Sequence, residues 1–179
     1  ELEAALEMAS DEMIDRTLTK LWGIKLGKST SSEAYTSRWI LAALSDFNGQ
    51  LQARDIIRFL EKATSTAGKT VYPDRYLMPA EIKRAVGECS SGKIIEIREE
   101  IKALAPILEK LENAPTEKKI LPFHSDTFDF TQGEEKIMKQ EGYLRIENDK
   151  YYLPEIIRHA LKFRYEKGAR PKVLSLLLK

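Results

Sequence analysis

Apolar residues recur at intervals of three and four positions through the first 113 residues of the chain. Between residues 2 and 22 they are Leu2, Leu6, Ala9, Met13, Ile14, Leu18, Leu21 and Trp22. This spacing places apolar side chains on one face of a helix. Similar patterns occur over 33–45, 52–64, 80–89 and 93–113. The sequence therefore predicts a mainly α-helical protein that begins with a helical bundle.

Capping and breaking residues set the expected ends of these helices. Gly23 is suited to stop the first helix, and Ser32 can cap the second. Ser90-Ser91-Gly92 is expected to interrupt the fourth pattern. Pro106 is expected to kink or divide the long helix over 93–113, because proline cannot donate the helical hydrogen bond.

The pattern changes after a linker at residues 114–117. A short helix is expected over 131–140, followed by strands at 143–146 and 151–153. Asn148-Asp149 lies between these strands and predicts a hairpin turn. A helix is expected from Pro154 to about Tyr165, and a last one from about Pro171. We therefore expect two domains, a helical bundle over 1–113 and a small winged-helix domain over 118–179, whose wing is the hairpin.

Charge and composition exclude several classes of protein. The 179 residues include 29 Lys and Arg against 28 Asp and Glu, a net charge of +1. A globally basic nucleic-acid coat is therefore excluded, whereas a local basic patch is not. Cys89 is the single cysteine, so no internal disulfide can form and a reducing, cytoplasmic location is expected. No apolar run approaches the roughly 20 residues of a membrane span.

The first residue is Glu1, and no basic and apolar leader follows it, so we expect a fragment or a processed product rather than a secretory precursor.

Motifs that could carry catalysis fail their context tests. Ala67-Gly68-Lys69-Thr70 ends like a phosphate loop, but Ala63 stands where that loop needs its first glycine, and a helix precedes it. His124, Asp126 and Asp129 lack the further soft or imidazole ligands that metal sites use, so we favour a solvated turn. Cys89 has no evident base and is expected to pack. We therefore expect no catalytic site and no cofactor within this chain.

Two arginines form the first candidate site. Arg54 and Arg58 are four residues apart, so they share one face of the helix over 52–64. Two guanidinium groups placed in this way could bind a phosphate with paired hydrogen bonds. The alternative is that they pair with Asp55, with Glu61 or with another domain.

The C-terminal region is the second candidate site. From Pro154 to the C-terminus there are seven basic and two acidic residues, a net charge of +5. The hairpin adds Arg145 and Lys150. A helix that enters a groove and a wing that holds phosphates would use such charges on double-stranded DNA. The candidate contacts are Arg145, Lys150, Arg158, Lys162 and Arg164. Packing of the wing against a neighbouring domain remains an equal alternative.

Three segments together resemble a known family. Residues 39–63, which contain Arg54-Asp55-Ile56-Ile57-Arg58-Phe59-Leu60, resemble the helical lid of P-loop ATPases of the AAA+ and STAND kind. Met78-Pro79-Ala80-Glu81-Ile82, followed by Ser90, Lys93 and Arg98-Glu99-Glu100, is similar to the later lid helices. Residues 151–161 resemble the end of the winged-helix domain that follows such lids. The resemblance covers about residues 15–175.

The resemblance implies a regulatory role. Arg54 matches the lid arginine that senses nucleotide phosphates in this family, and Arg58 is the second candidate. The Walker motifs are absent, so ATP and magnesium are implied for a parent protein whose nucleotide-binding domain lies upstream and is the implied partner. The winged helix would bind DNA or a protein. The alternative function is a stand-alone winged-helix DNA-binding protein whose helical bundle forms a homo-oligomer.

Overall fold

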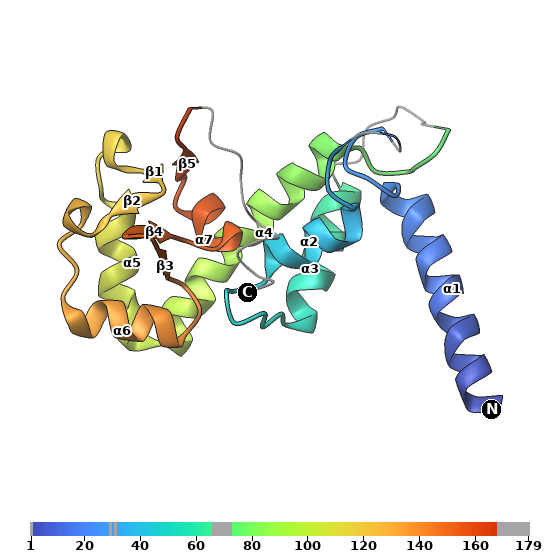
Figure 1. Ribbon diagram of the computed structural model, residues 1–179, viewed down its shortest axis with the longest axis horizontal. Coiled ribbons are helices and arrows are strands. Elements are labelled where there is room, and N and C mark those ends of the chain that lie inside the picture. Colours follow the sequence, from blue (N-terminus) through green and yellow to red (C-terminus); the bar gives the residue numbers. More distant parts are fainter. Residues whose placement is uncertain (1, 29, 31, 66–72, 168–179) are drawn as a thin grey trace.

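The structure is a computed structural model that describes residues 2–28, 30, 32–65 and 73–167, with the side chains of the first helix described from Glu12 onward. Most of these residues are helical, which confirms the expected mainly α class. Helix α4 crosses the middle of the molecule, and groups of elements pack at both of its ends (Figure 1). The first helix projects away from the rest at one side.

The N-terminal group of helices packs around the first half of α4. Its elements are α1 (Leu2–Trp22), α2 (Thr36–Leu44), α3 (Ala53–Ser65) and α4 (Pro79–Glu100). They enclose a cluster that we call the N-terminal core: Trp22, Leu26, Ile40, Ala43, Leu44, Phe59, Ala63, Leu77, Ile82, Ala85, Val86 and Cys89. Full burial of a side chain such as Phe59 contributes roughly 2 kcal/mol. The three- and four-residue spacing of these positions explains why the segments are helical.

The C-terminal elements pack around the second half of α4. They are η1 (Lys102–Leu104), α5 (Ala105–Glu112), η2 (Thr116–Lys118), β1 (Ile120–Leu121), β2 (Phe123–His124), η3 (Ser125–Thr127), α6 (Gln132–Gln140), β3 (Arg145–Glu147), β4 (Lys150–Tyr152), α7 (Glu155–Ala160) and β5 (Arg164–Tyr165). Their buried side chains form the C-terminal core with Ile94 and Ile97 of α4. Its other members include Leu104, Leu108, Leu121, Phe123, Met138, Tyr151, Leu153, Ile157 and Phe163.

Two small sheets lie in the C-terminal group. Strands β2, β4 and β3 form an antiparallel sheet in the order β2-β4-β3, with Ile146 opposite Tyr151. Strands β1 and β5 pair in parallel. The turn between β3 and β4 has positive φ angles at Asn148 (50°) and Asp149 (58°). Both residue types tolerate this conformation, and the predicted hairpin is confirmed.

Several predicted helix boundaries are wrong. Ser90-Ser91-Gly92 does not interrupt α4, because Ser90 Oγ donates to the carbonyl of Val86 at 2.7 Å and remains within the helix. The break instead falls at Ile101, and a separate helix with Pro106 in its first turn follows. The second helix starts at Thr36 rather than after Ser32.

The helix expected from Pro154 to Tyr165 ends at Ala160. Lys162 then adopts a φ of 61°, which redirects the chain into β5. The helix expected from Pro171 and the Ala67–Thr70 loop lie outside the described residues.

The two hydrophobic cores divide inside α4, between Cys89 and Ile94, and not at the predicted linker 114–117. The second half of α4 and all of α5 pack with the C-terminal strands. The cores therefore do not follow the predicted domains 1–113 and 118–179. Sequence periodicity marks a helix but does not show that its two halves serve different cores.

The connection between α2 and α3 docks on the turn that follows α6. The backbone N–H of Phe47 donates to the carbonyl of Gly142 at 2.8 Å, and Asn48 Nδ2 donates to the carbonyl of Gln140 at 2.9 Å. Arg145 Nη2 donates to the carbonyl of Phe47 at 3.2 Å, and its guanidinium carbon lies 5.0 Å from the centroid of the Phe47 ring. These contacts join the two groups of helices through side chains and backbone outside α4.

Gly142 allows this close approach. Its φ is +73°, and a Cβ atom there would lie 2.9 Å from Asp46 Cγ, whereas Gly49 has a φ of +75° and no atom within 4 Å of such a Cβ. We expect Gly49→Ala to cost about 1 kcal/mol for the backbone conformation alone. Gly142→Ala should cost at least about 1 kcal/mol more, because the docked loop must move. Urea unfolding of both variants measures the difference, and equal costs would contradict the docking.

Candidate functional site

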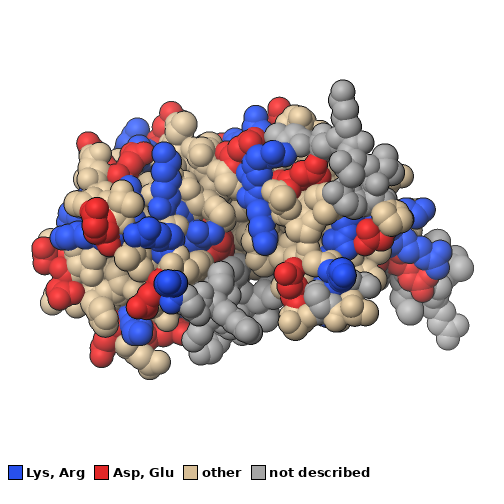
Figure 2. Space-filling model, turned by 90° about the horizontal axis from the view of Figure 1, so that it is seen from above, with Lys and Arg blue, Asp and Glu red and all other residues tan. Residues whose placement is uncertain are grey.

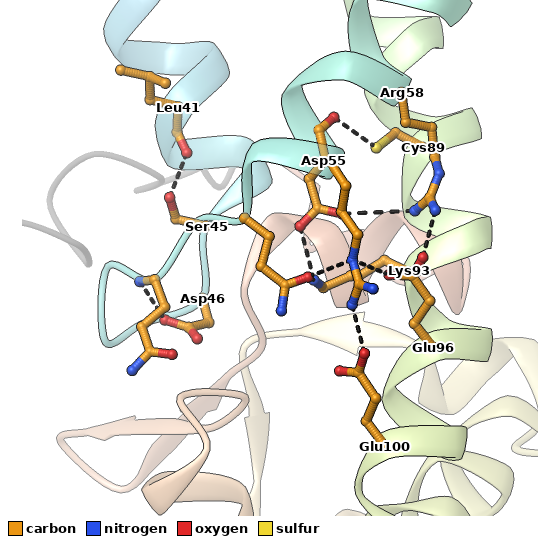
Figure 3. A network of polar contacts seen from close by, with 12 residues as sticks. Leu41, Ser45, Asp46, Asp55, Arg58, Cys89, Lys93, Glu96 and Glu100 are labelled. Atoms are coloured by element: carbon orange, nitrogen blue, oxygen red, sulfur yellow. Dashed lines mark hydrogen bonds and ion pairs between the residues drawn. The ribbon is translucent and has the colours of Figure 1, made fainter.

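The candidate site lies where α3 packs on α4. Asp55, Phe59 and Ala63 form the buried face of α3, and this places Arg54 and Arg58 along the edge that faces α4. Glu96 and Glu100, one helical turn apart on α4, lie opposite the two arginines. Figure 3 shows Arg58 beside Glu96, with Glu100 farther along α4. The predicted pair of arginines is therefore brought together with two carboxylates.

The arginines are paired within the chain. Arg54 Nη2 lies 2.6 Å from Glu100 Oε1, and Arg54 Nε lies 3.3 Å from Glu96 Oε2. Arg58 donates through Nη2 to Glu96 Oε1, and its Nη1 lies 3.7 Å from Asp55 Oδ1. Of the alternatives left open by the sequence, the pairing of Arg58 with Asp55 is present. Glu96 and Glu100 were not among the expected partners.

A buried ion pair lies behind the arginines. Lys93 Nζ is 2.8 Å from Asp55 Oδ2, and only 1% of Asp55 and 8% of Lys93 are exposed. Gln52 Oε1 accepts a hydrogen bond from Lys93 Nζ at 2.8 Å and another from Arg54 Nε at 2.7 Å. The buried pair and the half-exposed Arg54 are thereby joined in one network.

Lys93 was missed as a site residue. Its spacing from Cys89 and Ile97, four positions to either side, puts it on the buried stripe of α4. A lysine within an apolar stripe indicates a buried partner, and this was the signal that the sequence offered. The identity of that partner, Asp55, could not be read from spacing, because the two residues are 38 positions apart.

A small polar pocket adjoins the network. It has a volume of about 50 Å³ and is lined by Leu44, Asp46, Gln50, Gln52, Lys93, Tyr143 and Ile156. Its walls come from the N-terminal helices, from α4 and from the C-terminal group. This volume holds a few water molecules, and it is too small for a nucleotide, which needs several hundred Å³.

The surroundings shift the pKa values of several groups at the site, among them Asp46, Glu96 and Cys89. Burial raises the pKa of Asp46, although the N–H groups of Gln50 and Asn48 oppose this by donating to its carboxylate. The hydrogen bond from Arg58 lowers the pKa of Glu96. Burial raises the pKa of Cys89 to about 11, so its thiol stays protonated near neutral pH and is a poor nucleophile. As expected, Cys89 packs in the N-terminal core.

The five predicted nucleic-acid contacts separate into two groups. Arg145 is held against Phe47, and Arg158 donates to Glu155 and to the carbonyl of Phe163. These two side chains serve internal packing. Lys150 at the hairpin, together with Lys162 and Arg164, is exposed.

On the face shown in Figure 2, basic and acidic side chains are interspersed.

Arg158 belongs to a cluster that fixes β5 against α7. Glu155 is 4% exposed, and it accepts hydrogen bonds from Arg158 Nη2 at 2.7 Å and from Tyr165 Oη at 2.6 Å. His159 Nε2 lies 3.3 Å from the same carboxylate. Burial alone would raise the pKa of Glu155, but these partners together lower it to about 2.

Within the described ranges, no group of three or more His, Cys, Asp or Glu residues could hold a metal ion, and no helix is long and apolar enough to cross a membrane. Comparisons with protein-family models, with curated proteins and with solved structures found no match to this chain.

Removal of one member of the buried pair should be strongly destabilising. We expect Lys93→Met to cost about 3–5 kcal/mol, because it leaves the Asp55 carboxylate buried without its main partner. Adding Asp55→Asn should cost clearly less in that background than in the wild type. Lys83→Met, on the exposed face of α4, is the control and should change stability by less than about 0.5 kcal/mol. Additive losses in urea unfolding would contradict the pairing.

Glu155 should make stability depend on pH in the acid range. Its folded pKa of about 2 lies below the ordinary 4.5, so its contribution is complete above pH 4.5 and is lost as the pH falls toward 2. The loss should reach about 3 kcal/mol. Urea unfolding between pH 7 and pH 2 should show a shallower dependence for Glu155→Gln than for the wild type. Glu117→Gln, at an exposed position, is the control and should show the pH dependence of the wild type. The same dependence in Glu155→Gln would contradict the cluster.

Proposed function

We propose that this chain is the C-terminal regulatory part of a P-loop ATPase, in which a helical lid senses bound nucleotide and a winged-helix module responds. One observation carries the proposal. Helix α4 holds Glu96 and Glu100 against the arginines of α3, and it places Ile94 and Ile97 in the C-terminal core. A change at the arginines therefore acts on the helix that the C-terminal group packs around.

The packing favours transmission of such a change. The Asp55–Lys93 pair fixes α3 against α4, and the 46–50 loop, which connects α2 to α3, is bound to the turn at Gly142. A buried ion pair is stable only when both partners keep their geometry. A rotation of α3 would therefore move α4 with it and would also strain the docked loop.

The topology of the C-terminal group supports the winged-helix part of the proposal. Helix α6 comes directly before the β3–β4 hairpin, and the hairpin extends a sheet in the order β2-β4-β3. In a winged helix, the helix before the hairpin faces the partner and the hairpin is the wing. Because Arg145 and Arg158 are used internally, we favour a protein partner or the upstream domain over DNA.

The nucleotide would be held mainly outside this chain. The pocket beside Lys93 is too small for it, and we propose that Arg54 reaches its phosphates, since 45% of the Arg54 side chain is exposed. ATP and magnesium are therefore proposed for an upstream nucleotide-binding domain of the parent protein. That domain is the proposed partner of the α3–α4 edge.

The test uses the parent protein. The coding sequence upstream of Glu1 should contain an in-frame GxxxxGK[ST] motif after a strand pattern. In that protein, Arg54→Ala should raise the half-saturating ATP concentration by roughly tenfold to a hundredfold, as expected for lost hydrogen bonds to a charged group. Arg38→Ala, an exposed arginine of α2, is the matched control. An unchanged ATP response to Arg54→Ala would contradict the proposal.

The second candidate is a stand-alone winged-helix DNA-binding protein with a helical oligomerisation bundle. The exposure of Lys150, Lys162 and Arg164 favours it. It requires this chain alone to bind duplex DNA with an affinity that falls steeply with salt. Replacing all three residues with alanine should then flatten that dependence. If the chain does not bind duplex DNA, or binds it independently of salt, the DNA-binding candidate is contradicted and the ATPase proposal stands.

A further inference from the structure

Two guanidinium groups converge on one carboxylate at the α3–α4 edge. Arg58 Nη2 donates to Glu96 Oε1, and Arg54 Nε lies 3.3 Å from Glu96 Oε2. Each oxygen of Glu96 thus faces a different arginine. Arginines bind the oxygens of carboxylates and of phosphoryl groups with similar geometry, so a pair that surrounds the two oxygens of Glu96 is also suited to a phosphoryl group.

The charges of this edge cancel in the structure. Arg54 and Arg58 carry two positive charges, and Glu96 and Glu100 carry two negative charges. Asp55 and Lys93 form a neutral pair behind them. An anion that approached the arginines would meet the carboxylates first. Binding of a phosphoryl group therefore requires that these carboxylates leave.

The two carboxylates are not held equally. Glu100 is about half exposed, with 51% of its side chain accessible, and an exposed ion pair contributes little to stability. Glu96 is 18% exposed and contacts both arginines. Arg54 can therefore exchange Glu100 for another anion at small cost, whereas exchange of Glu96 determines whether both arginines become available.

The surface of α4 accommodates the side chain of Arg58. A Cβ atom at Gly92 would lie 3.4 Å from Arg58 Nη1, so the guanidinium lies directly over the glycine. Gly92, which the sequence suggested as part of a helix break, provides room for this side chain within a continuous helix. Both α3, which carries Arg58, and α4, which carries Gly92, therefore determine the position of the guanidinium group.

The geometry points to a binding site for a phosphoryl group between Arg54 and Arg58, which Glu96 occupies in the absence of ligand and from which a phosphoryl group must displace it. Glu96 acts as an internal competitor that sets the affinity of the site. The inference deepens the proposed function and rests on it for the ligand class, because a nucleotide held by the upstream domain would present such a group.

The test measures pyrophosphate binding to this chain by isothermal titration calorimetry at low salt. Glu96→Gln should bind inorganic pyrophosphate at least about tenfold more tightly than the wild type, because the arginines lose their competitor. Glu99→Gln is the control: it makes the same change in net charge at an exposed position three residues away on α4, and it should bind pyrophosphate like the wild type. Adding Arg54→Ala or Arg58→Ala to Glu96→Gln should remove the gain.

A second variant keeps the test valid if Glu96→Gln does not fold. Glu100→Gln alters a half-exposed side chain and should give a smaller gain, which Arg54→Ala should abolish. The carbon-13 NMR signal of the Glu96 carboxyl group provides an independent measurement in the wild type. Arg58 lowers the pKa of this carboxyl group, and the pKa should return toward the ordinary value when pyrophosphate binds. If Glu96→Gln and Glu100→Gln bind no more tightly than Glu99→Gln, the inference is overturned.

This result is separable from the test of the proposed function. Tight pyrophosphate binding by Glu96→Gln, combined with a parent protein whose ATP response ignores Arg54, would leave the phosphoryl site intact and remove the ATPase proposal. An ATP response that depends on Arg54, without any gain in Glu96→Gln, would keep the ATPase proposal and remove the role of Glu96.

Discussion

Helix α4 is the constraint on which the rest of the structure depends, because it forms part of both hydrophobic cores. Its first half contributes Ile82, Ala85, Val86 and Cys89 to the N-terminal core, and its second half contributes Ile94 and Ile97 to the C-terminal core. A single rigid helix therefore fixes the spacing of the two groups. Neither group can rotate about the helix axis without exposing apolar side chains.

The polar residues at the crossover between the cores make this arrangement specific. Lys93 lies on α4 between Cys89 and Ile94, where one core ends and the other begins. Its pairing with Asp55 costs desolvation, so its contribution is to discriminate among ways of packing α3 on α4 rather than to add stability. A register that separated Lys93 from Asp55 would leave Lys93 buried without this partner. The arginines next to this pair are consequently held at a defined place on the edge.

The sequence predicted local structure well where one segment determined it. The periodic spacing predicted the bounds of α1 and α3 to within a residue or two. Asn148-Asp149 predicted the hairpin, because both residue types tolerate the left-handed backbone of its turn. Contacts between distant segments could not be predicted. Ser90-Ser91-Gly92 has the composition of a break, but Gly92 accommodates Arg58 from another helix.

The same limit applied to the candidate sites. Arg54 and Arg58 could be placed on one face, whereas their partners on α4 are 38 to 46 positions away. Arg145 and Arg158 looked like surface charges, and they bind Phe47 and Glu155 instead. Net charge over a segment does not reveal which of its bases are used internally.

The central claim is that α4 couples the two cores into one cooperative structure, and chemical unfolding tests it most directly. Both tryptophans, Trp22 and Trp39, report on the N-terminal core, whereas the methyl group of the buried Met138 reports on the C-terminal core. Tryptophan fluorescence and the carbon-13 methyl signal of Met138 should give the same midpoint and slope in urea. Two separate transitions would show that the cores unfold independently and would contradict the account.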